Sequence, residues 1–140
     1  MSFADYKEKN ITLEESEFSE NINDILEILL ENKVQDITFL DLAEQSAISD
    51  SMIIGTTMSE IHSRALVKKI LTKIKQKDRK NLPVREEGND RGNWIVLDFV
   101  NYMIHLMIPE TRELYNLENL WAKSKITRIH DSKIENTTEI

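Results

Sequence analysis

The sequence predicts a mixed α/β (α+β) protein, in which a mixed β-sheet of about five strands packs with helices. Two segments, residues 21–32 and 59–77, repeat apolar residues at helical spacing. Five shorter segments are rich in the β-branched, aromatic and other apolar residues that strands favour. They are residues 36–42, 51–57, 83–87, 94–99 and 102–108. A length of 140 residues predicts one domain with a single core.

The outer parts of the chain are predicted to flank this domain, which we place at residues 21–121. Residues 1–20 are acidic and polar, and we expect a tail or a frayed helix there. Residues 122–140 form a polar C-terminal tail that is expected to be mostly disordered, because such a composition buries too little apolar surface to offset the entropy of folding.

Local signals support the boundaries of the inner elements. Ser59 is a plausible N-cap for the helix over residues 59–77. Residues 83–87 are predicted to form only a short or edge strand, since Pro83 donates no hydrogen bond to a neighbouring strand.

The two segments 94–99 and 102–108 are predicted to form a hairpin, which is the most informative part of the chain. A two-residue turn at residues 100–101 places Trp94 opposite Met107, and residues directly opposite share a face of the sheet. One face is then a purely apolar core. The other face combines apolar residues with a carboxylate and an imidazole: Trp94, Val96, Asp98, Met103, His105 and Met107.

This mixed face of the hairpin has two interpretations. Trp and Met are enriched at the centres of protein interfaces, which favours a surface that binds a partner. Alternatively, the segment that follows the hairpin covers this face and buries it within the domain. The pattern favours neither, and both arrangements can coexist on different parts of the sheet.

The segment PETRELYNLENLW, residues 109–121, is predicted to form a helix after the hairpin. Pro109 suits the first helical turn, and Glu110 suits the positive end of the helix dipole. Apolar residues cover a wider arc than a surface helix needs, so we expect the segment to contact both the rest of the domain and a partner. The expected contacts are with the domain (Leu117, Leu120) and with a partner (Tyr115, Glu118, Trp121). Alternatively, Arg112 pairs inside the domain with Asp98 or Glu118, and the sequence does not decide between these arrangements.

The charge balance bears on the class of partner. The chain has 18 Lys and Arg against 25 Asp and Glu, a net charge of -7. Such a chain is a poor general nucleic-acid binder, because affinity for phosphate comes from Lys and Arg, but an acidic face suits a basic protein. The absence of cysteine fits a reducing cytoplasm, and no apolar run is long enough to span a bilayer. We therefore expect a cytoplasmic protein without membrane contact.

One segment departs from the acidic balance. From Arg64 to Lys80 the basic residues far outnumber the acids, of which Asp78 is the single example. They form either a solvated helix face that balances the acidic N-terminal region or an edge that faces RNA. The residues that would face RNA are Lys68, Lys69, Lys73 and Lys75.

The sequence carries no recognised signature of catalysis or of metal binding. His62, His105 and His130 match no zinc-binding spacing, and the chain has no cysteine. A nucleotidyltransferase needs closely spaced metal-binding carboxylates, whereas the relevant strand offers Asp98 alone. We therefore expect no catalytic residue, no metal and no cofactor, and a protein that is not an enzyme.

Four segments carry a resemblance to a known family: DITFLDL (36–42), EEG (86–88), more loosely SDSMIIGTTMSEIHSRAL (49–66), and WIVLDFVNYMIHLMIPETRELYNLENLW (94–121). The last matches the pattern W-x-x-x-D, then H, then P-E-x-R-x-x-Y-x-L-E-x-L-W. Over about residues 21–121 the chain resembles the ribosomal silencing factor (RsfS/Iojap) family. It departs from the usual family pattern at Met58, Ile61 and Ser63, where Thr, Arg and Val are typical.

The resemblance implies a nucleotidyltransferase-like fold without known transferase activity. It implies binding to the large ribosomal subunit through large-subunit ribosomal protein fourteen, a steric block of subunit joining, and repression of translation. Two alternatives stay open: a nucleotide-using enzyme on the same fold, and a large-subunit assembly factor that binds ribosomal RNA. An exposed apolar face would also permit a homodimer of the free protein. The expected partner-binding residues are Trp94, Asp98, Met103, His105, Met107, Tyr115, Glu118 and Trp121.

Overall fold

A computed structural model describes residues 8–42, 49–120 and 125–131. It contains a mixed seven-stranded sheet with the strand order β1-β7-β2-β3-β6-β5-β4. The strands are β1 (Glu8–Thr12), β2 (Gln35–Asp41), β3 (Ser51–Thr56), β4 (Arg85–Glu87), β5 (Trp94–Asp98), β6 (Tyr102–Met107) and β7 (Lys125–His130). The predicted α/β (α+β) class is confirmed, with two strands more than the five expected.

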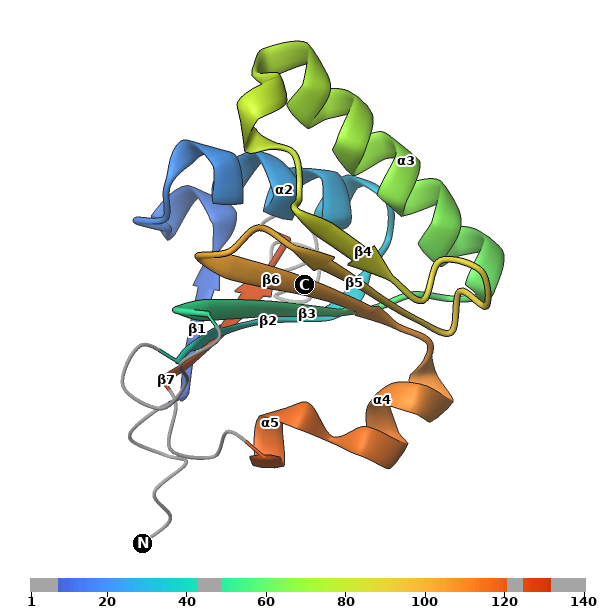
Figure 1. The fold of residues 1–140 in the computed structure, drawn as a ribbon. Coiled ribbons are helices and arrows are strands. Elements are labelled where there is room, and N and C mark those ends of the chain that lie inside the picture. Colours follow the sequence, from blue (N-terminus) through green and yellow to red (C-terminus); the bar gives the residue numbers. More distant parts are fainter. Residues whose placement is uncertain (1–7, 43–48, 121–124, 132–140) are drawn as a thin grey trace, which may run out of the picture.

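Helices lie on both faces of the sheet (Figure 1). On one face lie the long helices α2 (Glu20–Glu31) and α3 (Glu60–Lys77), and on the other lie the short helices α4 (Pro109–Tyr115) and α5 (Leu117–Leu120). Two single turns of 3-10 helix, η1 (Leu13–Glu15) and η2 (Arg79–Asn81), complete the described helices. None of the helices in the described ranges has the length and apolar character needed to cross a membrane.

Strands β1 and β7 were not predicted, and they pair with each other in parallel at one side of the sheet. Strand β7 also pairs antiparallel with β2. The prediction of flanking tails is therefore wrong for the residues of β1 and β7. Strand β7 buries Ile126 on one face of the sheet and Ile129 on the other, so no alternation of apolar residues marks it in the sequence. Residues 1–7 and 132–140 of the predicted tails lie outside the described residues.

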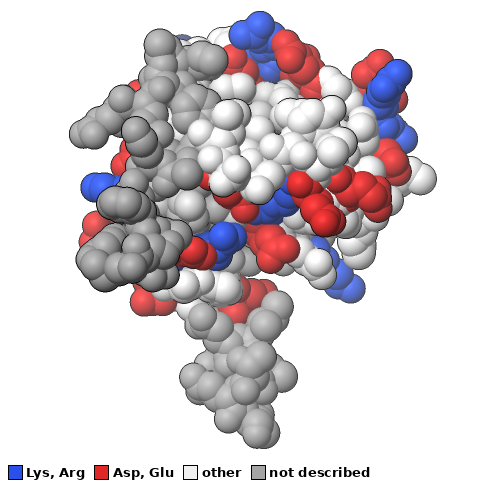
Figure 2. All heavy atoms as spheres, turned by 90° about the horizontal axis from the view of Figure 1, so that it is seen from below, with Lys and Arg blue, Asp and Glu red and all other residues white. Residues whose placement is uncertain are grey.

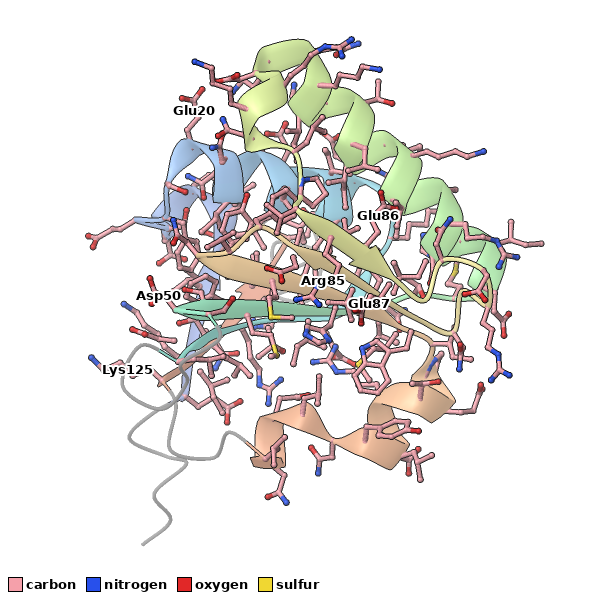
Figure 3. All side chains as sticks on the ribbon, in the orientation of Figure 1. Glu20, Asp50, Arg85, Glu86, Glu87 and Lys125 are labelled. Atoms are coloured by element: carbon pink, nitrogen blue, oxygen red, sulfur yellow. The ribbon has the colours of Figure 1, made fainter. Side chains whose placement is uncertain are left out.

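The predicted hairpin is confirmed together with its register. Trp94 lies opposite Met107, and the N–H of Phe99 donates to the carbonyl of Tyr102 at 2.9 Å next to the two-residue turn. Strand β4 lies at the sheet edge, as the proline before it predicted. Its side chains are exposed, and Figure 3 shows Arg85, Glu86 and Glu87 along this edge.

The helices α2 and α3 are held by a large apolar core and by ordinary caps. The side chain of Ser59 accepts a hydrogen bond from the N–H of His62 at 3.1 Å, which confirms the predicted cap of α3. The buried residues on this side of the sheet include Ile25, Leu26, Leu29, Leu66, Ile70, Ile53, Ile95, Leu97, Ile104 and Leu106. The other face has a smaller cluster of Leu40, Leu42, Met52, Ile54, Met107, Leu117 and Ile126.

Candidate protein-docking face

The segment after the hairpin is not the single helix that the sequence predicted. Helix α4 begins at Pro109 and ends at Tyr115, and the capping residue Asn116 adopts the left-handed conformation with a φ of 42°. Asn tolerates this conformation better than most residues do, and it turns the chain so that α5 starts in a new direction. As a result Leu117 points to the sheet and is buried, as predicted, whereas Leu120 is 69% exposed. The prediction that Leu120 holds the segment against the domain is therefore wrong.

A buried arginine fastens α4 and α5 to the sheet. The Arg112 guanidinium donates to the hydroxyls of Thr56 and Thr38, each at 2.9 Å, and to the carbonyl of Asp36. Its remaining two donors reach both carboxylate oxygens of Glu118, at 3.4 and 3.3 Å. All five N–H donors of the guanidinium thus have an acceptor, which is what a buried cation requires. We call this network the Arg112 clasp.

Glu118 was expected either to meet a cation of the partner or to pair with Arg112 inside the domain, and the structure shows the internal pair. Its carboxylate is occupied by Arg112, and a second guanidinium, that of Arg128, lies 3.9 Å away. The Glu118 side chain is only 19% exposed. Its charge serves to neutralise a buried cation inside the domain, so it is not available as a separate contact for a partner.

Trp94, His105 and Tyr115 form a group of tilted, contacting rings where the hairpin meets α4. The indole Nε1–H of Trp94 donates to Nδ1 of His105 at 2.9 Å, and the rings of Trp94 and Tyr115 lie 4.7 Å apart. Burial lowers the pKa of His105 to about 4, because it disfavours the charged imidazolium. Its Nε2 is buried without a hydrogen-bond partner in the structure. His105 therefore holds the Trp94 indole by a hydrogen bond and is itself buried, whereas the prediction had placed it on the docking surface.

Two further residues of the predicted docking set are also buried. Met107 has no exposed surface, and Asp98 is 8% exposed. The Asp98 carboxylate accepts a hydrogen bond from the N–H of Val100 at 2.8 Å and lies 3.4 Å from the guanidinium of Arg85. The prediction that Met107 contacts a partner directly is therefore wrong. The main contact of Asp98 is with the backbone of the hairpin turn. Trp121 lies outside the described residues.

The remaining residues expose apolar side chains around the two short helices. Tyr115 is 54% exposed, and the sequence reasoning missed Leu114, which is 76% exposed. The signal for Leu114 was the wide apolar arc of its segment, which a helix of only seven residues cannot bury completely. We define the α4–α5 face as the exposed or half-buried residues Trp94, Val96, Met103, Leu114, Tyr115 and Leu120.

Acidic side chains accompany this apolar surface. Figure 2 shows an uncharged area on the side of the molecule that carries α4 and α5, with a group of Asp and Glu side chains beside it. Helix α4 itself presents the exposed carboxylates of Glu110 and Glu113. An apolar centre with a charged border is the usual composition of a protein interface.

The lysines that were considered for RNA lie on the opposite side of the sheet. Helix α3 carries Lys68, Lys69, Lys73 and Lys75, and all four are exposed. Figure 1 shows α3 above the sheet and the pair α4 and α5 below it. A partner on the α4–α5 face therefore does not meet these lysines.

Two further observations on the described residues concern acidic and histidine clusters and Gly55. In the described ranges, no three His, Asp or Glu side chains are grouped closely enough to hold a metal ion. Gly55 lies within β3, and a Cβ atom there would come within 2.6 Å of the Val34 side chain. Because glycine has no side chain, Val34 can pack directly against the strand at this position.

The fold and this face define a mixed α/β protein whose short helices present apolar side chains next to carboxylates. The sequence profile of a family described as "Ribosomal silencing factor during starvation" (RsfS) matches residues 15–139. The chain belongs to the ribosomal silencing factor family.

Individual relatives agree with the family profile. The chain is 34% identical over 102 residues to "Ribosomal silencing factor RsfS" of Haemophilus influenzae, covering 70% of this chain and 98% of that protein. It is 34% identical over 103 residues to "Mitochondrial assembly of ribosomal large subunit protein 1" of Mus musculus, covering 73% of this chain but only 45% of the mouse protein. A crystal structure of a Chromobacterium violaceum protein is similar with a TM-score of 0.69 and 29% identity, over 76% of this chain and 88% of that one.

Proposed function

We propose that this protein is a ribosomal silencing factor that binds the large ribosomal subunit through large-subunit ribosomal protein fourteen. The bound protein blocks subunit joining by its bulk and thereby represses translation. The single observation that carries the proposal is the α4–α5 face. Here a member of the silencing-factor family exposes large apolar side chains to solvent. A contiguous exposed apolar patch on a folded protein commonly marks a site of interaction with a partner.

The anchors of this face are its aromatic and aliphatic residues. Tyr115 is exposed, and its ring packs at a tilt against that of Trp94, so it presents a large rigid side chain at little cost in conformational entropy on binding. Leu114 and Leu120 extend the apolar surface on either side along α4 and α5. Of the residues proposed from sequence, Trp94, Met103 and Tyr115 are thus retained as direct contacts.

The charge of the protein suits a basic partner. Its net charge is -7, and the carboxylates of Glu110 and Glu113 lie on the helix that carries Leu114 and Tyr115. Opposite charges on two proteins raise the rate of association, and salt weakens this effect. Binding to a basic ribosomal protein should therefore be fast at low salt and slower at high salt.

Sedimentation of a cell lysate through a sucrose gradient tests the proposal. We expect the protein with free large subunits and little of it with joined ribosomes. The double variant Leu114→Ser/Leu120→Ser should lose this association. A matched control is Ile61→Ser/Val84→Ser, which removes two equally exposed apolar side chains, 74% and 68% exposed, outside this face. Equal recovery with small subunits, or equal loss in both variants, would contradict the proposal.

A second candidate function is large-subunit assembly, and two observations favour it. The mouse relative is named for assembly of the mitochondrial ribosomal large subunit. The exposed lysines of α3 offer a basic surface for ribosomal RNA. Binding to naked large-subunit RNA, lost when Lys68, Lys69, Lys73 and Lys75 are changed to Gln, would support this candidate over the first.

A further inference from the structure

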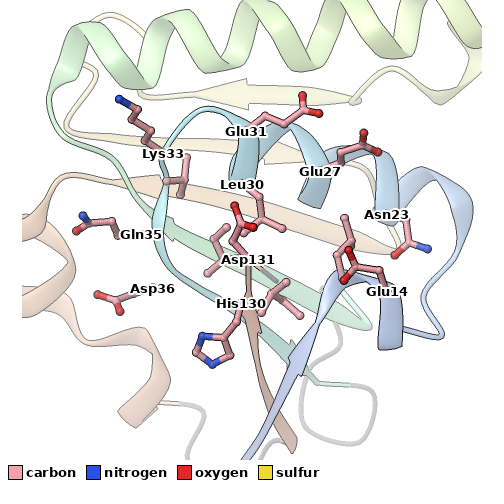
Figure 4. Close-up of a pocket in the computed structure, with 14 residues that line it drawn as sticks. Glu14, Asn23, Glu27, Leu30, Glu31, Lys33, Gln35, Asp36, His130 and Asp131 are labelled. Atoms are coloured by element: carbon pink, nitrogen blue, oxygen red, sulfur yellow. The ribbon is translucent and has the colours of Figure 1, made fainter. Parts of the chain in front are cut away.

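A groove of about 1210 Å³ opens where β1 and β7 end and β2 begins, beneath α2. Figure 4 shows that side chains of α2, of the start of β2 and of the end of β7 surround it. None of the residues of the α4–α5 face lines it. The groove is therefore a separate feature of the fold.

The groove exists because the sheet divides at this point. Strands β2 and β7 pair from Asp41 opposite Lys125 to Thr38 opposite Arg128, which is the last pair of their register in the described residues. Beyond it, β7 continues alongside β1, whereas β2 shifts register and passes through Asp36, whose φ is 49°. The two strands separate, and the gap between them becomes the groove.

The groove has an apolar floor and an acidic rim. Leu30 of α2 is half-buried there, and Ile37 and Ile129 lie buried beneath it. Exposed carboxylates of Glu27, Glu31 and Asp36 line the rim, together with Glu14 and Asp131. Lys33 is the single lysine or arginine among the lining residues.

Two properties decide what such a groove accommodates. Its volume exceeds the roughly 300–1,000 Å³ of most small-molecule sites, which favours a length of polypeptide. Its carboxylates are also spread out, since no three acidic or histidine side chains in the described ranges are grouped to hold one metal ion. Separate carboxylates suit separate cationic side chains, each of which forms its own charge-assisted hydrogen bond.

We propose that this groove binds an extended basic segment of another protein. Lysine and arginine side chains of the segment pair with the rim carboxylates, and one of its apolar side chains rests on Leu30, Ile37 and Ile129. The inference goes beyond the proposed function, because it assigns a second docking surface that does not involve the α4–α5 face.

Fluorescence anisotropy with a labelled nine-residue peptide, Arg-Lys-Leu repeated three times, tests the inference. The groove variant is Glu27→Gln/Glu31→Gln/Asp36→Asn, in which Asn keeps the left-handed conformation acceptable at position 36. The control variant Glu17→Gln/Glu86→Gln/Asp90→Asn removes the same number of charges from exposed positions outside both the groove and the α4–α5 face. We expect the groove variant to bind about tenfold more weakly at low salt, and the control variant to change less than about twofold.

Two further peptides separate the groove from general attraction to an acidic protein. A peptide with Ser in place of each Leu should bind several-fold more weakly, because it cannot use the apolar floor. A peptide with Glu in place of each Arg and Lys should not bind. Equal weakening in both protein variants, equal binding of the Ser peptide, or no binding of the first peptide would each overturn the inference. Binding of large-subunit ribosomal protein fourteen should persist in the groove variant, so failure here leaves the proposed function unaffected.

Discussion

The two faces of the sheet are built on different principles. Helices α2 and α3 are long, are capped by serine side chains, and contribute to a cluster of seventeen buried residues among those described. Helices α4 and α5 are short, α4 lacks a side-chain cap, and the cluster beneath them contains seven described buried residues. The first face is stabilised mainly by apolar burial. The second depends on the Arg112 clasp, a small set of directional polar contacts.

This difference explains how apolar residues stay exposed on one side of a stable domain. An ordinary amphipathic helix is held by its apolar face and leaves polar residues in water. Helix α4 is instead held largely by Arg112, so Leu114 and Tyr115 remain free to face outwards. The polar clasp therefore substitutes for apolar packing at the proposed docking surface.

The largest expected effect comes from removing the clasp. Arg112→Ala leaves the Glu118 carboxylate without its buried cation, and breaking such a pair costs about 3–5 kcal/mol of unfolding free energy. Hydrogen exchange should accelerate at α4 and α5 while α2 and α3 stay protected. Ile70→Ala is the control on the other face, where a cavity costs about 2–5 kcal/mol and all elements should exchange faster together. Normal protection of α4 in Arg112→Ala would contradict this account.

The second effect is a pH dependence that arises under the α4–α5 face. Burial lowers the pKa of His105 from 6.5 to about 4 in the folded protein, so between these values the unfolded chain binds a proton that the folded protein does not. The free energy of unfolding should therefore fall as the pH decreases through this window, by about 3 kcal/mol at its lower end. Urea unfolding of the wild type and of His105→Gln measures this contribution as the difference between two pH profiles. Parallel profiles would show that His105 is not buried as described.

A third, smaller effect separates docking from folding. Tyr115→Ala removes a side chain that is 54% exposed, so stability should change by less than about 1 kcal/mol. Affinity for large-subunit ribosomal protein fourteen should fall about thirtyfold, which corresponds to about 2 kcal/mol for a central residue. Trp94→Ala should reduce both quantities, since the indole also bonds to His105. A melting curve and a binding isotherm on each variant give the answer, and unchanged binding in both would move the docking surface elsewhere.

The smallest effect is expected on the opposite face. Changing Lys68, Lys69, Lys73 and Lys75 to Gln should alter affinity for the isolated ribosomal protein by less than about twofold, because α3 lies across the sheet from the α4–α5 face. Binding to whole large subunits should weaken further only if RNA lies near α3. A large loss with the isolated protein, in a variant that melts normally, would mean that α3 belongs to the docking surface.

Local patterns predicted the elements whose partners lie nearby in the chain. The hairpin register followed from alternation on both sides of a two-residue turn, and α3 followed from its periodicity and from Ser59. Strands β1 and β7 were missed because their pairing is almost entirely long-range. Glu8 and Arg128, which form an ion pair across these strands, lie 120 positions apart in the sequence.

Prediction of the site failed where burial depends on what packs above a residue. Met107 and His105 have the composition of an interface, but α4 and α5 cover them. The break at Asn116 decides which residues these helices bury, and Asn inside a helical pattern was the available signal, since Asn favours caps and turns. Once the break is known, the burial of Leu117 and the exposure of Leu120 both follow from the change of direction.

The parallel pairing of β1 with β7 has a consequence for how the chain matures during its own synthesis. Among the described strands, a ribosome synthesises β1 first and β7 last. Strand β7 is the strand with which β1 forms its backbone hydrogen bonds. Until β7 has left the exit tunnel, β1 has no strand beside it, and the outer edge of β2 stays uncovered. Uncovered strand edges pair readily with other chains. A nascent chain stalled before residue 125 should therefore be far more prone to aggregation than the finished protein.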